Sequence, residues 1–260
     1  MSALAENAAS VVRSQYPEAR GVPIAVERLA EKLGVSSISY TNLIEDGRLE
    51  TDGFTTQILV RASANAARRR FTVAHELAHL LLTRPGQAAV ERRLATDNEV
   101  ERFCDQFAAA LLLPRDWVIE RCQGRPETLQ SIRDLAAATE TSLAASLVRL
   151  QQTLGWTSML LQWRANAGSW QFRWAAGVPH ALHGRIRATA DTRRVFDEIR
   201  NKTTQDVAVE LPLEVRAETA RWPAIVSCKH SSVLALVQRP PTPRSSHQLR
   251  HAPEPRLHEL

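Results

Sequence analysis

Three residues, His75, Glu76 and His79, have the types and the spacing of a catalytic metal site. They form the pattern His-Glu-x-x-His, in which the two histidines stand four residues apart. Residues four apart lie on one face of a helix, so both imidazoles can bind one metal ion while the Glu76 carboxylate reaches water bound to that ion. The pattern therefore predicts a zinc site with hydrolytic chemistry, in which His75 and His79 are ligands and Glu76 is the general base.

An ordinary amphipathic core helix is the alternative interpretation of this segment. It would have to place two imidazoles and a carboxylate among apolar neighbours, where unpaired polar groups cost free energy. These neighbours are Phe71, Val73, Ala74, Leu77, Leu80 and Leu81. The metal site is the better interpretation.

A catalytic zinc site needs a third protein ligand and keeps one position for water. Glu101 and Asp105 stand four residues apart in a downstream helical segment and share a face, whereas Glu99 points to another side. We expect Glu101 to be the third ligand and Asp105 to accept the free N–H of a ligating histidine. In the alternative, both acids are solvated helix charges.

The elements that must position these residues can be predicted from local patterns. Ser63 or Asn65 can cap a helix that carries the histidines and stops at Pro85, and Asp97 can open a second helix closed by Pro114. Helical spacing also predicts helices over 3–16 and 23–33, and residues 36–40 and 54–61 predict strands. The turn residues in between are Asp46, Gly47, Asp52 and Gly53.

The stretch from Phe54 to Pro114 resembles the ImmA/IrrE family of metallopeptidases. The motifs that carry the resemblance are RRRFTVAHELAHLLL and ERFCDQFAAALLLP, with Glu101 at the family's third ligand position. This chain has Ala78 where the family usually has Gly, and Cys104-Asp105 where it usually has Ala-Asn. We expect Cys104, one turn from Glu101, to be a small buried residue. The alternatives are a redox-sensitive thiol or a thiol that reaches the metal.

The resemblance implies an α+β fold: a mainly helical, zincin-like metallopeptidase domain with a short sheet, over residues 1–122. It further implies a cytoplasmic zinc endopeptidase that cleaves a helix-turn-helix, phage-repressor-type transcriptional repressor and so relieves repression under stress or DNA damage. Residues 54–61, as an exposed edge strand beside the cleft, would bind the substrate by strand addition. The alternative is a metal-binding antirepressor or antitoxin-like module that binds a partner without cutting it.

The rest of the chain predicts three further regions. Residues 123–155 form a helical, helix-turn-helix-like segment with helices over 127–138 and 142–153. Its one strong phosphate-binding candidate is Arg149, so direct DNA binding is not expected. Residues 156–238 form a small α+β region of unknown role, with a hairpin over 158–176, and residues 239–260 form a disordered tail.

Composition is that of a soluble globular protein of 260 residues, 44% apolar and 23% charged. The three cysteines are too few for a disulfide framework and indicate a reducing compartment, and no apolar run suits a membrane helix. The net charge of +5 lies in the second half, since residues 1–122 sum to −1 and residues 123–260 to +6. A surplus this small is typical of a solvated surface.

Overall fold

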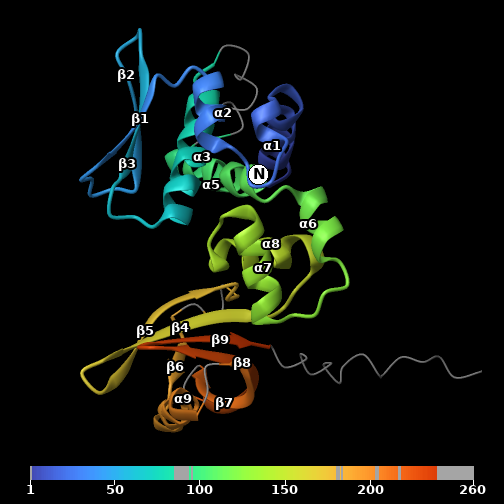
Figure 1. Cartoon of the computed structure of the whole chain (residues 1–260), viewed down its shortest axis with the longest axis vertical. Helices are drawn as coiled ribbons and strands as arrows, with labels where there is room; N and C mark the ends of the chain where they lie inside the picture. The colour runs from blue at the N-terminus through green and yellow to red at the C-terminus, as the bar shows by residue number, and fades with distance from the viewer. Residues whose placement is uncertain are drawn as a thin grey trace, which may run out of the picture.

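The computed structural model describes residues 2–84, 94, 96–179, 182, 184–202, 205–215 and 218–238. These residues form a mixed α+β structure in three parts that follow one another along its long axis (Figure 1). An N-terminal part of helices and a small sheet lies at one end, a group of short helices in the middle, and a larger sheet at the other end. The tail predicted over 239–260 lies outside the described residues. None of the described helices is both long and apolar enough to cross a membrane.

The N-terminal part is built on four helices, α1 (Ser2–Gln15), α2 (Val26–Lys32), α3 (Ala66–Leu82) and α5 (Asp97–Leu112), with a 3₁₀ turn at Pro17–Ala19. The α5 helix packs against both α1 and α3. Asn65 caps α3 by accepting from the Arg68 N–H, and Thr96 and Glu99 form a reciprocal capping box at the start of α5. The helices predicted around the histidines and around Glu101 are therefore present.

A three-stranded sheet flanks α3. It consists of β1 (Ser37–Thr41), β2 (Gly47–Thr51) and β3 (Thr56–Arg61), in the order β1-β3-β2. The prediction that residues 54–61 form an exposed edge is wrong, because β3 lies at the centre, parallel to β1 and antiparallel to β2. The edge strand beside α3 is β2, which the sequence did not predict because turn residues stand at both of its ends. Of those residues, Asp52 does hold a turn, since its carboxylate accepts from the N–H groups of Phe54 and Thr55.

Three helices form the middle part: α6 (Arg115–Cys122), α7 (Leu129–Thr139) and α8 (Leu143–Leu154). The sequence predicted α7 and α8 but not α6. Thr128 and Ser142 cap α7 and α8, and Glu140 adopts a left-handed conformation between them, with φ of 52°. Arg149 is only 2% exposed, and its guanidinium binds the Glu6 carboxylate and the Leu113 carbonyl. It is therefore a structural link from α8 to α1.

The C-terminal part is a six-stranded antiparallel sheet in the order β5-β4-β9-β8-β7-β6, joined by one helix. Its elements are β4 (Met159–Asn166), β5 (Ser169–Ala176), β6 (Ile186–Ala188), α9 (Ala190–Lys202), β7 (Val207–Val215), β8 (Glu218–Lys229) and β9 (Ser232–Val237). The predicted β4–β5 hairpin is present and turns through Ala167 and Gly168, both at positive φ. The sequence did not predict β6 or β8.

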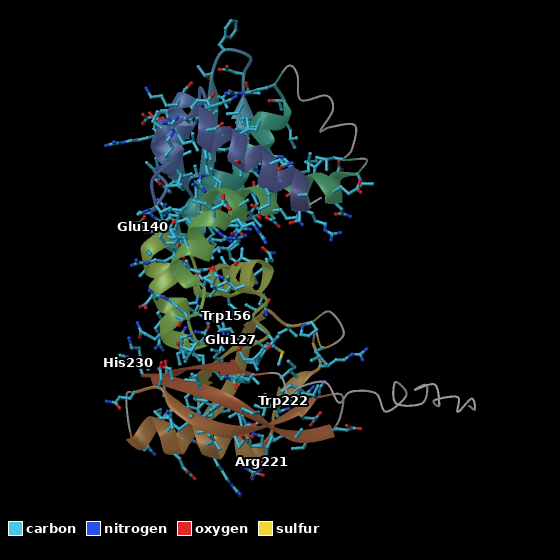
Figure 2. All side chains as sticks on the ribbon, turned by 90° about the vertical axis from the view of Figure 1, so that its right-hand side faces the viewer. Glu127, Glu140, Trp156, Arg221, Trp222 and His230 are labelled. Atoms are coloured by element: carbon cyan, nitrogen blue, oxygen red, sulfur yellow. The ribbon has the colours of Figure 1, made fainter. Side chains whose placement is uncertain are left out.

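The middle helices are fixed to this sheet by apolar packing and by Glu127. Leu160 and Leu236 from the sheet join the core of α6, α7 and α8. The Glu127 carboxylate accepts hydrogen bonds from the backbone of Thr157 and Ser158, at the junction that Figure 2 shows beside Trp156.

Candidate metal centre and cleft

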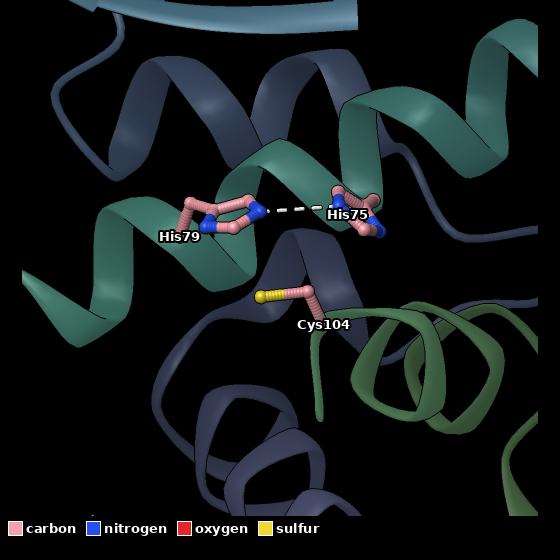
Figure 3. Close-up of side chains that lie close together, drawn as sticks. All are labelled: His75, His79 and Cys104. Atoms are coloured by element: carbon pink, nitrogen blue, oxygen red, sulfur yellow. Dashed lines mark hydrogen bonds between the residues drawn. The ribbon is translucent and has the colours of Figure 1, made fainter. Parts of the chain in front are cut away.

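The two histidines on α3 point their Nε2 atoms at each other. His75 Nε2 and His79 Nε2 lie 3.1 Å apart, with the ring centroids 4.9 Å apart (Figure 3). Both side chains emerge from one face of α3 because they are one helical turn apart. Two imidazole nitrogens at this separation can direct their lone pairs at one metal ion.

Glu101 on α5 completes the triangle. Its Oε2 lies 3.3 Å from His75 Nε2 and its Oε1 lies 3.3 Å from His79 Nε2. Ligands about 2.0–2.1 Å from a tetrahedral zinc ion are separated by about 3.3 Å. The three measured separations fit that spacing, so His75, His79 and Glu101 could together hold zinc.

Cys104 is an alternative to Glu101 as the third metal ligand. Its Sγ lies within 4.8 Å of ligand nitrogens of both histidines, and the side chain is fully buried (Figure 3). Burial, with the nearby carboxylates of Glu101 and Glu76, raises the pKa of the Cys104 thiol to about 12. The Glu101 carboxylate is the better fit, since its two oxygens lie at zinc-ligand spacing from both Nε2 atoms, whereas the raised pKa of the Cys104 thiol opposes the loss of its proton.

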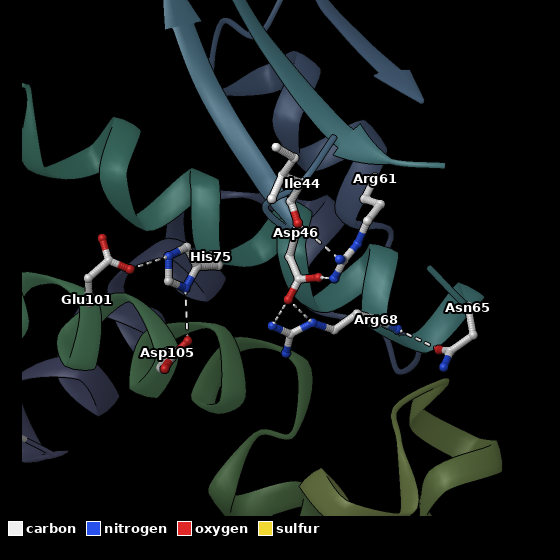
Figure 4. A network of polar contacts seen from close by, with 8 residues as sticks. All are labelled: Ile44, Asp46, Arg61, Asn65, Arg68, His75, Glu101 and Asp105. Atoms are coloured by element: carbon white, nitrogen blue, oxygen red, sulfur yellow. Dashed lines mark hydrogen bonds and ion pairs between the residues drawn. The ribbon is translucent and has the colours of Figure 1, made fainter. Parts of the chain in front are cut away.

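Asp105 lies on the other side of the His75 ring. Its Oδ1 is 3.0 Å from His75 Nδ1, as Figure 4 shows. Burial lowers the pKa of His75, but the hydrogen bond and the charge of Asp105, together with the charges of Glu76 and Glu101, outweigh it, so the pKa is raised. The pKa of His79 is lowered by burial and by the charge of His75. The hydrogen bond between Asp105 and His75 would hold the proton on His75 Nδ1 and direct His75 Nε2 towards a metal.

Glu76 is held between α3 and the edge strand. It is only 7% exposed, and the Leu49 N–H of β2 donates to its carboxylate. Burial raises its pKa, the neighbouring Glu101 adds to this, and the charge of His75 and the Leu49 hydrogen bond act in the opposite direction. A carboxylate with a raised pKa accepts a proton more readily than an ordinary glutamate.

These groups line a cleft of about 870 Å³ between β2 and the helices α3 and α5. At one end of the cleft, Asp46 pairs with Arg61 and with Arg68, whose Nε lies 2.8 Å from the Asp46 carboxylate (Figure 4). At Gly47, β2 approaches α3 so closely that a Cβ atom would lie 2.2 Å from Thr72 Cγ2 and 3.1 Å from Glu76 Oε1. Sequence reasoning missed Asp46, Gly47 and Leu49, since nothing local shows that a loop glycine packs on a helix 25 residues later.

A mixed α+β fold with two histidines and a glutamate converging beside a buried carboxylate is the arrangement of a metallohydrolase. The family model of the IrrE N-terminal-like domain, a peptidase family, matches residues 18–151. The chain belongs to this family, as the motif resemblance indicated.

One curated relative is the radiation response metalloprotease IrrE of Deinococcus radiodurans, 29% identical over 100 residues. The match covers 36% of this chain and 30% of the relative, so the chain spans less than a third of that protein's length. A solved structure titled Mycobacterium tuberculosis transcriptional regulator aligns with a TM-score of 0.46 at 16% identity, over 88% of this chain and 75% of that one.

Proposed function

We propose that this protein is a zinc-dependent, site-specific endopeptidase acting on a helix-turn-helix transcriptional repressor. The observation that carries the peptidase assignment is the meeting of His75, His79 and Glu101 at zinc-ligand spacing, next to the buried Glu76, in a cleft bordered by an edge strand. Family membership supports the same assignment.

His75, His79 and Glu101 would hold the zinc ion, and Asp105 would orient His75. When bound, zinc supplies a Lewis acid that polarises the scissile carbonyl and makes a bound water more acidic. Glu76 accepts the proton of the attacking water and passes it to the leaving amine.

Strand β2 would bind the substrate as an extended peptide. It is one of the two outer strands of its sheet and borders the cleft through residues 47–49. Apart from the Leu49 N–H, which donates to Glu76, the backbone groups on its outer edge could form a ladder with a peptide. Such a ladder would place a peptide bond next to the site without requiring a particular side chain. This role replaces the one that the sequence assigned to residues 54–61.

The choice of a repressor as the substrate rests on the family resemblance, and a cytoplasmic location follows from such a substrate. The competing proposal is a metal-binding antirepressor that binds its partner without cutting it. A binding module does not need a buried carboxylate beside the metal ligands, whereas a peptidase does, so Glu76 favours the enzyme.

The deciding experiment compares the parent with Glu76→Gln, using the repressor encoded beside the gene as substrate and mass spectrometry of the products. We expect the parent to cut at one site, and Glu76→Gln to bind the repressor and retain zinc but produce no fragments, because an amide cannot accept the proton. Glu120→Gln is the matched control, since Glu120 is exposed on α6, and it should cut normally. An intact repressor with the parent, or equal cleavage by Glu76→Gln, would exclude the proposed mechanism.

A further inference from the structure

A second cavity of about 570 Å³ adjoins the cleft. It lies among α1, α3, α5 and α8, and it shares Arg68, Phe71 and Asp105 with the cleft. Because the same three side chains line both spaces, the second cavity borders the cleft at the Arg68 end of α3.

The lining of the second cavity suits apolar side chains. Small apolar surface comes from α3, α5 and α8, with Phe71 at the shared boundary, and consists of Ala67, Ala109, Ala144, Ala145 and Val148. Uncharged polar side chains, such as those of Gln106 and Thr141, line the rest. The charges around it are already paired: Arg149 binds Glu6 and the Leu113 carbonyl, and Arg68 binds Asp46. An occupant with apolar side chains would gain from burial, whereas a charged one would find no unpaired counterion among these residues.

The direction of β2 tells which part of a substrate would reach this cavity. Asp46 lies beside Arg68, and Leu49 lies beside Glu76, so β2 and α3 run in the same direction along the cleft. Antiparallel pairing is the more common and the slightly more stable kind. A peptide antiparallel to β2 would run from the His79 end of the cleft towards Arg68, with its C-terminal part at the second cavity.

The length of the path follows from helix geometry. Arg68 precedes His75 by seven residues on α3, which is about 10 Å along the helix axis. An extended peptide covers that distance with about three residues. The third and fourth residues after the scissile bond are therefore the ones that would enter the second cavity.

We propose that the second cavity is a specificity subsite that takes apolar side chains of the substrate, from about the third residue on the C-terminal side of the scissile bond. This inference rests on the proposed peptidase function and adds a sequence preference to it. The preferred substrate has an apolar pair that begins at about the third residue after the cut.

The test uses synthetic hydroxamates, because they bind at a catalytic zinc and need no cleavage. Acetohydroxamate probes the metal site alone. Succinyl hydroxamates followed by Ala-Leu-Leu or by Ala-Ser-Ser probe the C-terminal side, and Leu-Leu-Ala and Ser-Ser-Ala hydroxamates probe the N-terminal side. Calorimetry with the zinc-loaded full chain should give about 10-fold tighter binding for the Ala-Leu-Leu probe than for the Ala-Ser-Ser probe, the gain expected from partial burial of two leucines.

A filling variant links this preference to the second cavity. Ala144→Trp, on the α8 wall, should abolish the 10-fold difference, and Val148→Trp should act in the same way. The N-terminal-side probes should be unaffected by either change. Ala137→Trp is the matched control, since Ala137 is exposed on α7 outside the cavity lining, and it should keep the preference.

The outcomes separate the two levels of the proposal. If acetohydroxamate does not bind the zinc-loaded chain, the peptidase assignment fails and the subsite falls with it. If acetohydroxamate binds but the C-terminal-side probes do not differ, or their difference survives Ala144→Trp and Val148→Trp, the subsite alone is wrong. A preference that Ala144→Trp removes only from the N-terminal-side probes would reverse the proposed direction and also overturn it.

Discussion

Gly47→Ala tests whether β2 must pack directly on α3, the helix that carries His75 and His79. The added Cβ would lie 2.2 Å from Thr72 Cγ2, whereas carbon atoms in contact prefer about 3.5–4.0 Å. Thr72 is 3% exposed and cannot turn away freely, so β2 or α3 must move by roughly 1.5 Å. Overpacking of this kind costs about 1–3 kcal/mol of unfolding free energy.

Gly21→Ala is the matched control for this change. Its new Cβ would meet no atom closer than the Pro23 oxygen at 3.9 Å, and neither Gly21 nor Gly47 has positive φ. Both substitutions stabilise the folded state by the same loss of unfolded-chain entropy, about 0.4–1 kcal/mol. The difference between the two variants therefore isolates the clash at Gly47.

Thr72→Ser removes the methyl group that the clash involves. In the double variant with Gly47→Ala, we expect a favourable coupling of about 1 kcal/mol. Recovery should be incomplete, since the Cβ would still lie 3.1 Å from Glu76 Oε1 and 3.2 Å from the Leu59 carbonyl oxygen.

Urea unfolding should be followed by circular dichroism, with hydrogen exchange to locate the loss in β2. All six tryptophans follow residue 116, so their fluorescence reports on other parts of the chain. A displacement of about 1 Å next to Glu76 should also lower kcat/KM by up to about 100-fold. If Gly47→Ala is as stable as Gly21→Ala, or if Thr72→Ser shows no coupling to Gly47→Ala, then β2 does not pack as closely on α3 as the structure indicates.

Three further predictions concern the metal and the buried thiol of Cys228. Glu101→Ala, like His75→Ala, should lose the one zinc ion per chain that we expect metal analysis of the purified parent to find. Glu99→Gln, which keeps the capping box, should retain this zinc ion, and the reverse pattern would refute the ligand assignment. Asp105→Ala should weaken zinc affinity by roughly 10 to 100-fold in a competition titration, while Asp105→Asn keeps an acceptor for His75 Nδ1 and should stay near the parent; equal affinities would make Asp105 a mere helix charge. Burial raises the pKa of Cys228 from 9.0 to about 11, so the thiol loses its proton at lower pH in the unfolded chain than in the folded one. The free energy of unfolding should therefore fall as the pH rises from 9 to 11, by up to about 2–3 kcal/mol. Urea midpoints of Cys228→Ala should therefore fall less steeply over that range than those of the parent, and parallel curves would contradict the effect.

Local sequence was sufficient to predict the helices that carry the candidate metal ligands. The four-residue spacing of His75 and His79 fixes their common face on any helix, and a cap such as Asn65 marks where that helix begins. The same spacing argument chose Glu101 and Asp105 over Glu99, and the structure places both acids beside the histidines. Short-range hydrogen bonds and helical periodicity decide these features, so they can be read without knowing the rest of the chain.

The tertiary structure alone decided what surrounds that helix. Gly47 has the sequence signature of a turn, but it belongs to the edge strand because only a residue without a side chain fits against Thr72. Arg149 has the signature of a phosphate contact, but Glu6, 143 residues earlier, binds it in the core. Partners this far apart in sequence leave no local pattern, because packing and ion pairing depend on distance in space. The edge strand, the walls of the cleft and the cavity beside it therefore follow only from the folded chain.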